Sequence, residues 1–175
     1  MKAILQSEQM ALTVSRLAHQ LLEDPALLSQ TALIGIQPRG VFLSDRLVQE
    51  LRRNDAPAFD YGRLDITFYR DDVRKELHVP SETQIGFSIE GKRVVLVDDV
   101  LYTGRTIRAA LDALMDFGRP ARVELLVLID RRYSRELPVQ PDYSGRTIDS
   151  IVSQRVKVLW KERDGRDEVI LLDQD

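Results

Sequence analysis

Apolar and polar residues alternate along this chain with two different periods. From residue 5 to residue 22 apolar side chains recur every three or four positions, which predicts an amphipathic helix with Ser7 as its N-cap. Asp24 and Pro25 are expected to close this helix. Almost uninterrupted apolar, β-branched runs predict buried strands at residues 31–37, 93–99 and 122–130. Helical spacing returns after the first two of these runs, at residues 41–53 and 103–117.

The order of these elements predicts the fold class. Apolar and polar residues alternate over residues 64–70, which predicts a further strand. Two more strands are predicted in the tail, at residues 156–161 and 167–172. Strands that alternate with helices through short connections form parallel sheets with right-handed crossovers. We therefore expect one α/β domain over residues 1–175, a Rossmann-like parallel sheet with a small hood. The hood would come from the C-terminal tail, and the pattern leaves open whether the first helix joins it.

Composition narrows the class of protein. The chain has 175 residues, of which 43% are hydrophobic and 30% charged, as in ordinary globular domains. It has no cysteine, which excludes disulfides, thiolate nucleophiles and cysteine-bound metals and fits a cytoplasmic location. Neither a signal peptide nor an apolar run of about 18 residues is present, so no membrane contact is expected. The net charge of −3 argues against general coating of nucleic acid but leaves a local basic face open.

The stretch VVLVDDVLYTGRT, residues 94–106, carries the strongest chemical signal. Asp98 and Asp99 end a buried strand, where ligands of open parallel sheets bind. Gly104 then gives the conformational freedom that a tight turn needs before a helix, and such a turn binds anions through backbone N–H groups. The carboxylates could accept hydrogen bonds from two neighbouring hydroxyl groups, and the turn could bind a phosphate. A ribose 5-phosphate carries both kinds of group. The spacing alone leaves open an ordinary acidic turn with a capped helix. Neither a Walker loop nor a dinucleotide fingerprint is present.

The same stretch resembles the phosphoribosyl-pyrophosphate (PRPP) signature of type I phosphoribosyltransferases. LIGIQPRGVFLSDRL, LDITFYRDD, RELP and DYSG follow the order seen in the PyrR family, whose members are pyrimidine-operon attenuators and uracil phosphoribosyltransferases. The resemblance covers roughly residues 4–172. It implies the type I phosphoribosyltransferase fold and the reaction of uracil with PRPP to give UMP and diphosphate. Mg²⁺ would arrive with PRPP and have few protein ligands; His19 and His78, the only histidines, show no metal spacing, so no protein-held metal site is expected.

The resemblance assigns roles to the substrate loops. Asp98 and Asp99 would hold the ribose hydroxyls, and Arg39 with the backbone at Gly40 would meet the diphosphate. Arg70 would stabilise the leaving diphosphate where a flexible loop, residues 71–92, begins; a mobile surface loop without a role is the alternative. Pro38 replaces the family's usual threonine and removes a donor there. The remaining PRPP-binding positions are Val100, Leu101, Tyr102, Thr103, Gly104, Arg105 and Thr106.

Base recognition would fall to two other positions. Arg131 follows a strand where related transferases place a cation against an exocyclic oxygen, and Tyr143 would stack on the base. The segment DRRYSRELP departs from the family's DRG and HRELP, and Tyr143 could equally be a core aromatic. Purine-salvage relatives carry a carboxylate just before the threonine-glycine pair. Tyr102 stands there in this chain, which favours a pyrimidine.

A second function of another class follows from the same resemblance. Family members bind leader mRNA of pyrimidine genes when UMP or UTP is present, through a basic face of a dimer, so a homodimer or higher homo-oligomer is expected. The matching positions in this chain are Ser15, Arg16, His19 and Arg146. The alternatives are that Arg16 and His19 only occupy a solvated helix face, leaving an enzyme without RNA binding, or that the protein is a regulator with negligible activity.

Overall fold

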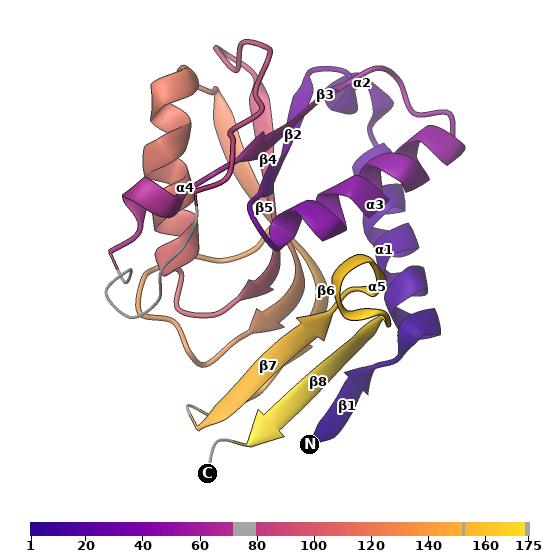
Figure 1. Ribbon diagram of the computed structural model, residues 1–175. Coiled ribbons are helices and arrows are strands. Elements are labelled where there is room, and N and C mark those ends of the chain that lie inside the picture. The colour runs from indigo at the N-terminus through magenta and orange to yellow at the C-terminus, as the bar shows by residue number, and fades with distance from the viewer. Residues whose placement is uncertain (72–79, 152, 174–175) are drawn as a thin grey trace.

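The computed structural model describes residues 1–71, 80–151 and 153–173, and a parallel sheet lies at its centre (Figure 1). The strand order is β3-β2-β4-β5-β6. All of its neighbouring strands pair in parallel, which confirms the α/β fold class. The strands are β2 (Thr31–Ile36), β3 (Asp60–Leu64), β4 (Arg93–Leu101), β5 (Arg122–Arg131) and β6 (Tyr143–Ile148).

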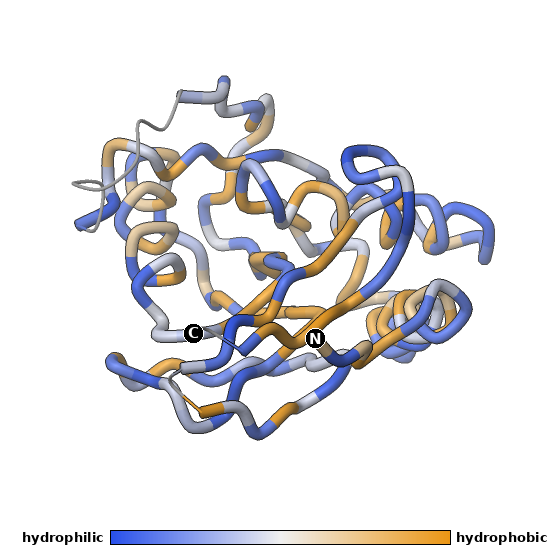
Figure 2. The backbone as a smooth tube through the Cα atoms, turned by 60° about the horizontal axis from the view of Figure 1, so that its bottom comes forward, coloured by the Kyte–Doolittle hydropathy of each residue, from blue (hydrophilic) through white to orange (hydrophobic). Residues whose placement is uncertain are grey.

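Helices cover both faces of this sheet, and alternate strand residues supply two separate cores. Leu33 and Val95 pack with α1 (Ser7–Leu22) and α3 (Gly40–Arg53), whereas Ile34 and Leu96 pack with α4 (Arg105–Leu114). This alternation is the two-residue period of a strand buried on both sides. Figure 1 shows α4 on one side of the sheet and α1 with α3 on the other. Figure 2 shows the hydrophobic colouring concentrated in the interior segments.

A second, antiparallel sheet of order β1-β8-β7 forms the hood. It joins β1 (Lys2–Leu5) to β7 (Gln154–Leu159) and β8 (Glu168–Asp173), with the short α5 (Lys161–Asp164) between the last two. Both termini lie at this sheet (Figure 1). Trp160 and Val158 of the hood are fully buried in the same core as α1 and α3, so the hood is packed against the main body. The helix α1 itself lies against α3 and β6, and it is β1 before it that enters the hood.

The prediction of a strand at residues 64–70 is wrong. The strand of this region, β3, ends at Leu64, and residues 67–69 form a 3₁₀ turn. The cause is local, because Asp65 Oδ1 accepts hydrogen bonds from both the backbone N–H and the hydroxyl of Thr67. Side-chain bonds of this kind compete with a strand ladder and favour turns. The expected loop 71–92 lies partly outside the described residues, which omit 72–79.

Two helix ends differ from expectation. Ser7 is the first residue of α1 and Gln6 is its N-cap, with the Gln6 backbone N–H donating to Gln9 Oε1 at 3.0 Å. Asp24 and Pro25 do follow α1, but they also begin the short α2 (Pro25–Leu28), where Asp24 accepts from the Leu27 N–H. The helix expected at 103–117 is α4 followed by a 3₁₀ turn, η3 (Met115–Phe117).

Candidate active site at the carboxyl end of the sheet

Two buried carboxylates mark the centre of the site. Asp98 and Asp99 lie near the end of β4 and are 6% and 5% exposed. The backbone N–H of Asp99 donates to Asp98 Oδ1 at 2.8 Å. Burial, and then the charge of Asp99, raise the pKa of Asp98 well above its usual value. Within the described residues Asp98 forms no ion pair of its own, because Arg39 pairs with Asp99, and a hydroxyl donor would stabilise its charged form.

The turn after β4 forms a small cavity. Gly104 has a φ of 94°, which other residues rarely adopt, and it is the N-cap of α4. The Arg105 N–H donates to Thr103 Oγ1 at 3.3 Å, and the backbone N–H of Glu136 donates to the Thr103 carbonyl at 2.9 Å. Residues 100–107 and Arg70 line a cavity of about 110 Å³ at this helix start. A turn with a helix N-terminus at its floor has the geometry of an anion site.

Arg39 connects three parts of the molecule. Its Nε donates to Asp99 Oδ2 at 2.9 Å, and its Nη2 donates to the carbonyl of Val158 in the hood. Gly40 lets this loop approach β4, because a Cβ at that position would lie 2.3 Å from the Val97 carbonyl oxygen. The predicted diphosphate loop and the predicted ribose carboxylates are thus brought together.

A cavity of about 230 Å³ lies between this rim and the hood. It is lined by Arg39, Asp99, Val100 and residues 155–158 of β7. Because β7 is at the edge of its sheet, its outer backbone groups face the rim. Val158 and Gln154 both direct their carbonyls outward, to Arg39 and to Arg131 respectively. Sequence reasoning missed this strand as part of the site, since only the folded chain brings residues 154–158 to Asp99.

Arg131 lies at the rim, but it is not open to a ligand in the way that the sequence suggested. It is 4% exposed, its Nε donates to Ser150 Oγ, and its Nη2 donates to the Gln154 carbonyl. Its guanidinium stacks 3.9 Å from the centre of the Tyr102 ring. Arg131 therefore ties the end of β5 to the start of the hood and holds Tyr102 in place.

Tyr143 is not brought to the site. It begins β6, and its hydroxyl accepts a hydrogen bond from Arg93 at 2.7 Å. Arg93 is the first residue of β4, whereas the candidate site lies at the last residues of that strand. The stacking role predicted for Tyr143 is therefore corrected, because its ring packs in the α1 and α3 core and its hydroxyl points toward the opposite rim.

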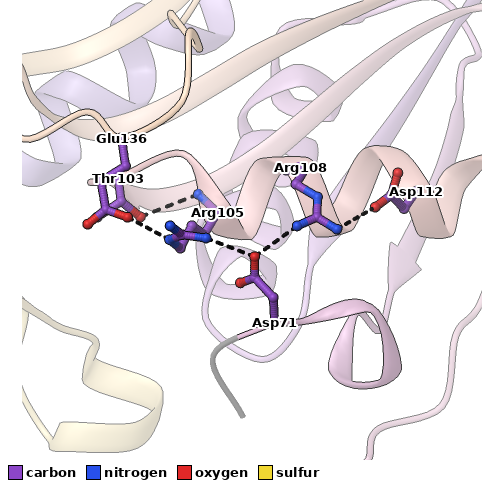
Figure 3. A network of polar contacts seen from close by, with 6 residues as sticks. All are labelled: Asp71, Thr103, Arg105, Arg108, Asp112 and Glu136. Atoms are coloured by element: carbon purple, nitrogen blue, oxygen red, sulfur yellow. Dashed lines mark hydrogen bonds and ion pairs between the residues drawn. The ribbon is translucent and has the colours of Figure 1, made fainter. Parts of the chain in front are cut away.

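A network of ion pairs lies at the first turns of α4, beside the turn at Gly104 (Figure 3). Arg105 pairs with Asp71 at 2.8 Å and with Glu136 at 2.6 Å, and Arg108 pairs with the same Asp71 oxygen at 2.8 Å. The side chain of Arg105 is thus directed to carboxylates on two other segments. Sequence reasoning did not single out Asp71 or Glu136, although both lie in the family-like segments YRDD and RELP.

The predicted RNA-contact residues share another face. Arg16 on α1 donates to the carbonyls of Ser144 and Gly145 in β6, next to Arg146. Arg146 in turn donates to the Ile4 carbonyl at 2.8 Å. His19 Nδ1 donates to the Ser15 carbonyl at 2.7 Å, one helical turn back. The structure therefore gathers Ser15, Arg16, His19 and Arg146 on adjoining surfaces of α1 and β6.

The described residues contain neither a membrane-spanning helix nor a cluster of metal ligands. None of the helices in residues 1–71, 80–151 and 153–173 is long and apolar enough to cross a membrane. The same part of the chain holds no group of three or more His, Cys, Asp or Glu side chains placed to bind a metal ion.

Comparisons with solved structures agree with this architecture. The hypoxanthine phosphoribosyltransferase of Trypanosoma cruzi superposes with a TM-score of 0.74 at 18% identity, covering 100% of this chain and 98% of that one. A hypoxanthine phosphoribosyltransferase from Staphylococcus aureus gives a TM-score of 0.70 at 19% identity, covering 96% and 90%. At these identities the likeness establishes the fold, and it confirms the type I phosphoribosyltransferase fold that the sequence predicts.

Sequence comparisons are more specific. The phosphoribosyl transferase domain model matches residues 1–163. The bifunctional protein PyrR of a Picosynechococcus species is 45% identical over 170 residues, covering 97% of this chain and 96% of the relative. The bifunctional protein PyrR of Desulfosudis oleivorans is 49% identical over 158 residues, covering 89% and 87%. With its parallel sheet, its acidic strand end and these relatives, the chain belongs to the PyrR family of phosphoribosyltransferases.

Proposed function

We propose that this phosphoribosyltransferase joins uracil to PRPP to form UMP and diphosphate, and that it also binds leader RNA of pyrimidine genes when uracil nucleotides are present. The observation that carries the transferase proposal is the arrangement at the end of β4. Asp98 and Asp99, the turn at Gly104 and Arg39 surround one rim of the sheet. These groups match the hydroxyls, the 5-phosphate and the diphosphate of a single PRPP molecule.

The sugar would bind through the acidic pair. Asp98 and Asp99 would accept hydrogen bonds from the two ribose hydroxyls, which would add to the one donor that the buried carboxyl of Asp98 already has, the backbone N–H of Asp99. The backbone N–H groups around Gly104 and the hydroxyls of Thr103 and Thr106 would hold the 5-phosphate. Displacement at the anomeric carbon develops positive charge on the sugar, as in glycoside hydrolysis, and carboxylates close to it lower that barrier.

The leaving diphosphate would bind at Arg39, and Arg70, which lines the cavity at the start of α4, would reach it from there. Mg²⁺ bound to the diphosphate oxygens would offset part of the charge that develops on the leaving group. The side-chain groups at the rim that could coordinate a metal ion are carboxylate oxygens, which are the ligands that Mg²⁺ prefers. Since no larger cluster of ligands occurs in the described residues, the diphosphate itself and water would supply most of its coordination.

The base would lie between Tyr102 and the outer edge of β7. Tyr102 is held by the Arg131 guanidinium, and it stands where purine-salvage enzymes carry a carboxylate. The carbonyls of Gln154 and Val158 are both taken by arginines, so the backbone of Val156 between them would present a donor and an acceptor to the base. Uracil offers both kinds of partner along one edge. The PyrR relatives support a pyrimidine rather than a purine substrate.

An assay of transfer tests the enzymatic proposal. Purified protein with PRPP, Mg²⁺ and labelled uracil should produce UMP and diphosphate, whereas hypoxanthine, guanine and orotate in place of uracil should yield little nucleotide. Equal rates with a purine base would contradict the assignment of uracil while leaving phosphoribosyl transfer intact.

The regulatory proposal rests on the surface formed by α1 and β6. Arg16 and Arg146 lie on neighbouring segments there, and the PyrR relatives are described as bifunctional. A homodimer would present two such surfaces to one RNA. Arg16→Gln should weaken binding of a pyrimidine-gene leader RNA by about tenfold and make its salt dependence shallower, while UMP synthesis stays unchanged. Arg52→Gln, an exposed change on α3, is the matched control. No RNA binding by the unmodified protein at low salt with UMP would leave an enzyme alone.

A further inference from the structure

The hood contributes two cations to the cavity that holds Arg39. Arg155 and Lys157 of β7 line the cavity of about 230 Å³ together with Arg39 and Asp99. They are two residues apart on one strand, so their side chains project on the same face of β7. Val156 and Val158 alternate with them and pack in or against the apolar core. Residues 155–158 all line the cavity, so the edge of the strand faces it, and the exposed side chains of Arg155 and Lys157 lie on the face opposite the packed valines.

The charge of this cavity is unbalanced. Three cationic residues line it against the single acidic residue Asp99, and Arg39 already forms an ion pair with the Asp99 carboxylate. Among the ion pairs within the described residues, none includes Arg155 or Lys157. Two positive charges thus remain beside the rim without a carboxylate to offset them.

Another arginine beside the hood shows the contrast. Arg46 of α3 reaches the hood from the main body, and there it pairs with Glu162 and Asp167 and stacks 4.8 Å from the centre of the Trp160 ring. Its charge is satisfied and holds the hood to α3. Within the described residues no such ion pair engages Arg155 or Lys157, and both side chains are exposed at the cavity, so both can meet an anionic ligand there.

We propose that Arg155 and Lys157 bind the diphosphate group of PRPP and of the product, so that it is held between the start of α3 and the hood. Diphosphate carries several negative charges and accepts hydrogen bonds at many oxygens, which suits one arginine fork and one lysine ammonium. Arg39 provides the contact from the main body and β7 provides the contact from the hood. The inference rests on phosphoribosyl transfer and not on the identity of the base.

Titration calorimetry with inorganic diphosphate and Mg²⁺ tests this directly. Arg155→Gln and Lys157→Gln should each weaken diphosphate binding by about tenfold, as expected for a lost charge-assisted contact, and the double variant by more. In steady-state assays the KM for PRPP should rise by a similar factor, while the KM for uracil stays the same. Arg163→Gln is the control, because it removes the same charge from exposed α5 in the hood, outside the cavity lining.

The outcomes separate this inference from the proposed function. If the unmodified protein forms UMP but both variants bind diphosphate as tightly as Arg163→Gln does, the hood contact is wrong and the transferase stands. If the unmodified protein binds diphosphate through Arg155 but transfers no uracil, the contact stands and the base is wrong. An absence of diphosphate binding in the unmodified protein would overturn the contact.

Discussion

The two ends of β4 carry pairs of charged residues that are buried to a similar degree, but one pair has opposite charges and the other like charges. Arg93, at the first residue, and Glu124 on β5 are each 7% exposed, and Arg93 Nε donates to Glu124 Oε2 at 3.1 Å. Asp98 and Asp99, near the last residues, are 6% and 5% exposed and carry like charges. The first pair is satisfied further by Thr31 and Tyr143. In the second pair Arg39 forms a hydrogen bond and an ion pair with Asp99, and it acts on Asp98 only through its charge.

This difference between the two pairs indicates which charged residues stabilise the fold and which are available to a ligand. A buried ion pair with its hydrogen bonds completed has nothing left to offer a ligand. A buried carboxyl without a cation costs free energy in the folded protein unless something binds it. The contrast supports the proposal that the rim with the incomplete pair is the site and that the opposite rim is scaffold, although both consist of charged residues at the ends of one strand.

The largest expected effect concerns the incomplete pair. Changing Asp98 and Asp99 together to Asn should lower kcat/KM for PRPP on the order of a thousandfold, because two charge-assisted hydrogen bonds are replaced by weaker neutral ones. Asp98→Asn alone, which leaves the Arg39–Asp99 ion pair in place, should keep or raise the free energy of unfolding measured with urea, because it removes a buried charge. Near-normal UMP synthesis by the double variant would mean that the pair has no part in binding ribose.

Breaking the complete pair should affect stability instead. Glu124→Gln leaves Arg93 buried without its carboxylate, and the free energy of unfolding should fall by about 3 kcal/mol. The rate per folded molecule should stay close to normal. The double change of Arg93→Met with Glu124→Leu is the control, since replacing both partners by apolar residues should restore much of the stability. A large loss of kcat in Glu124→Gln at full folding would place this rim in the mechanism.

The same contrast explains what the sequence could predict. The run before Asp98 and the turn at Gly104 are local, so their chemistry is readable in thirteen consecutive residues. Tyr143 lies in an equally suggestive segment, DYSG, but its place depends on pairing with Leu126 of β5 and on Arg93, fifty positions earlier. Contacts across such separations leave no periodic signal in the chain.

In the hood, too, contacts between residues far apart in the sequence could not be predicted. The strands β7 and β8 follow one another and were predicted from their alternation, with boundaries shifted by up to two residues. Their neighbour β1 comes from the other end of the chain, where Lys2 pairs with Leu171. The approach of β7 to Asp99, which adds Arg155 and Lys157 to the cavity, likewise appears only when both sheets are assembled.

The two ends of β4 should also respond to pH in opposite directions. Because the pKa of Asp98 is raised in the folded protein, its contribution to the free energy of unfolding falls as the pH rises from about 4 through the raised pKa. For Glu124, burial alone would raise the pKa, but hydrogen bonding and attraction to Arg93 outweigh it, so the pKa is lowered. Its contribution is present above about pH 4.3 and is lost as the pH falls through the lowered pKa.

Urea unfolding from about pH 3 to pH 8 measures both responses. The stability of the unmodified protein relative to Asp98→Asn should decrease with rising pH, and its stability relative to Glu124→Gln should increase. Each pKa unit corresponds to about 1.4 kcal/mol, so the slopes are measurable. Slopes of the same sign would show that the two pairs do not differ in the way that their surroundings indicate.

The smallest expected effect decides to which rim Tyr143 belongs. Tyr143→Phe keeps the ring and removes the hydroxyl that accepts a hydrogen bond from Arg93, so the free energy of unfolding should fall by about 1 kcal/mol. Tyr143→Leu removes the ring as well and should lose more stability, because the ring packs against the core. Neither change should alter the KM for uracil, since the side chain points to the scaffold rim. A raised KM for uracil in Tyr143→Leu, with the KM for PRPP unchanged, would show that the ring contacts the base. The two ends of β4 would then not divide into a binding site and a scaffold.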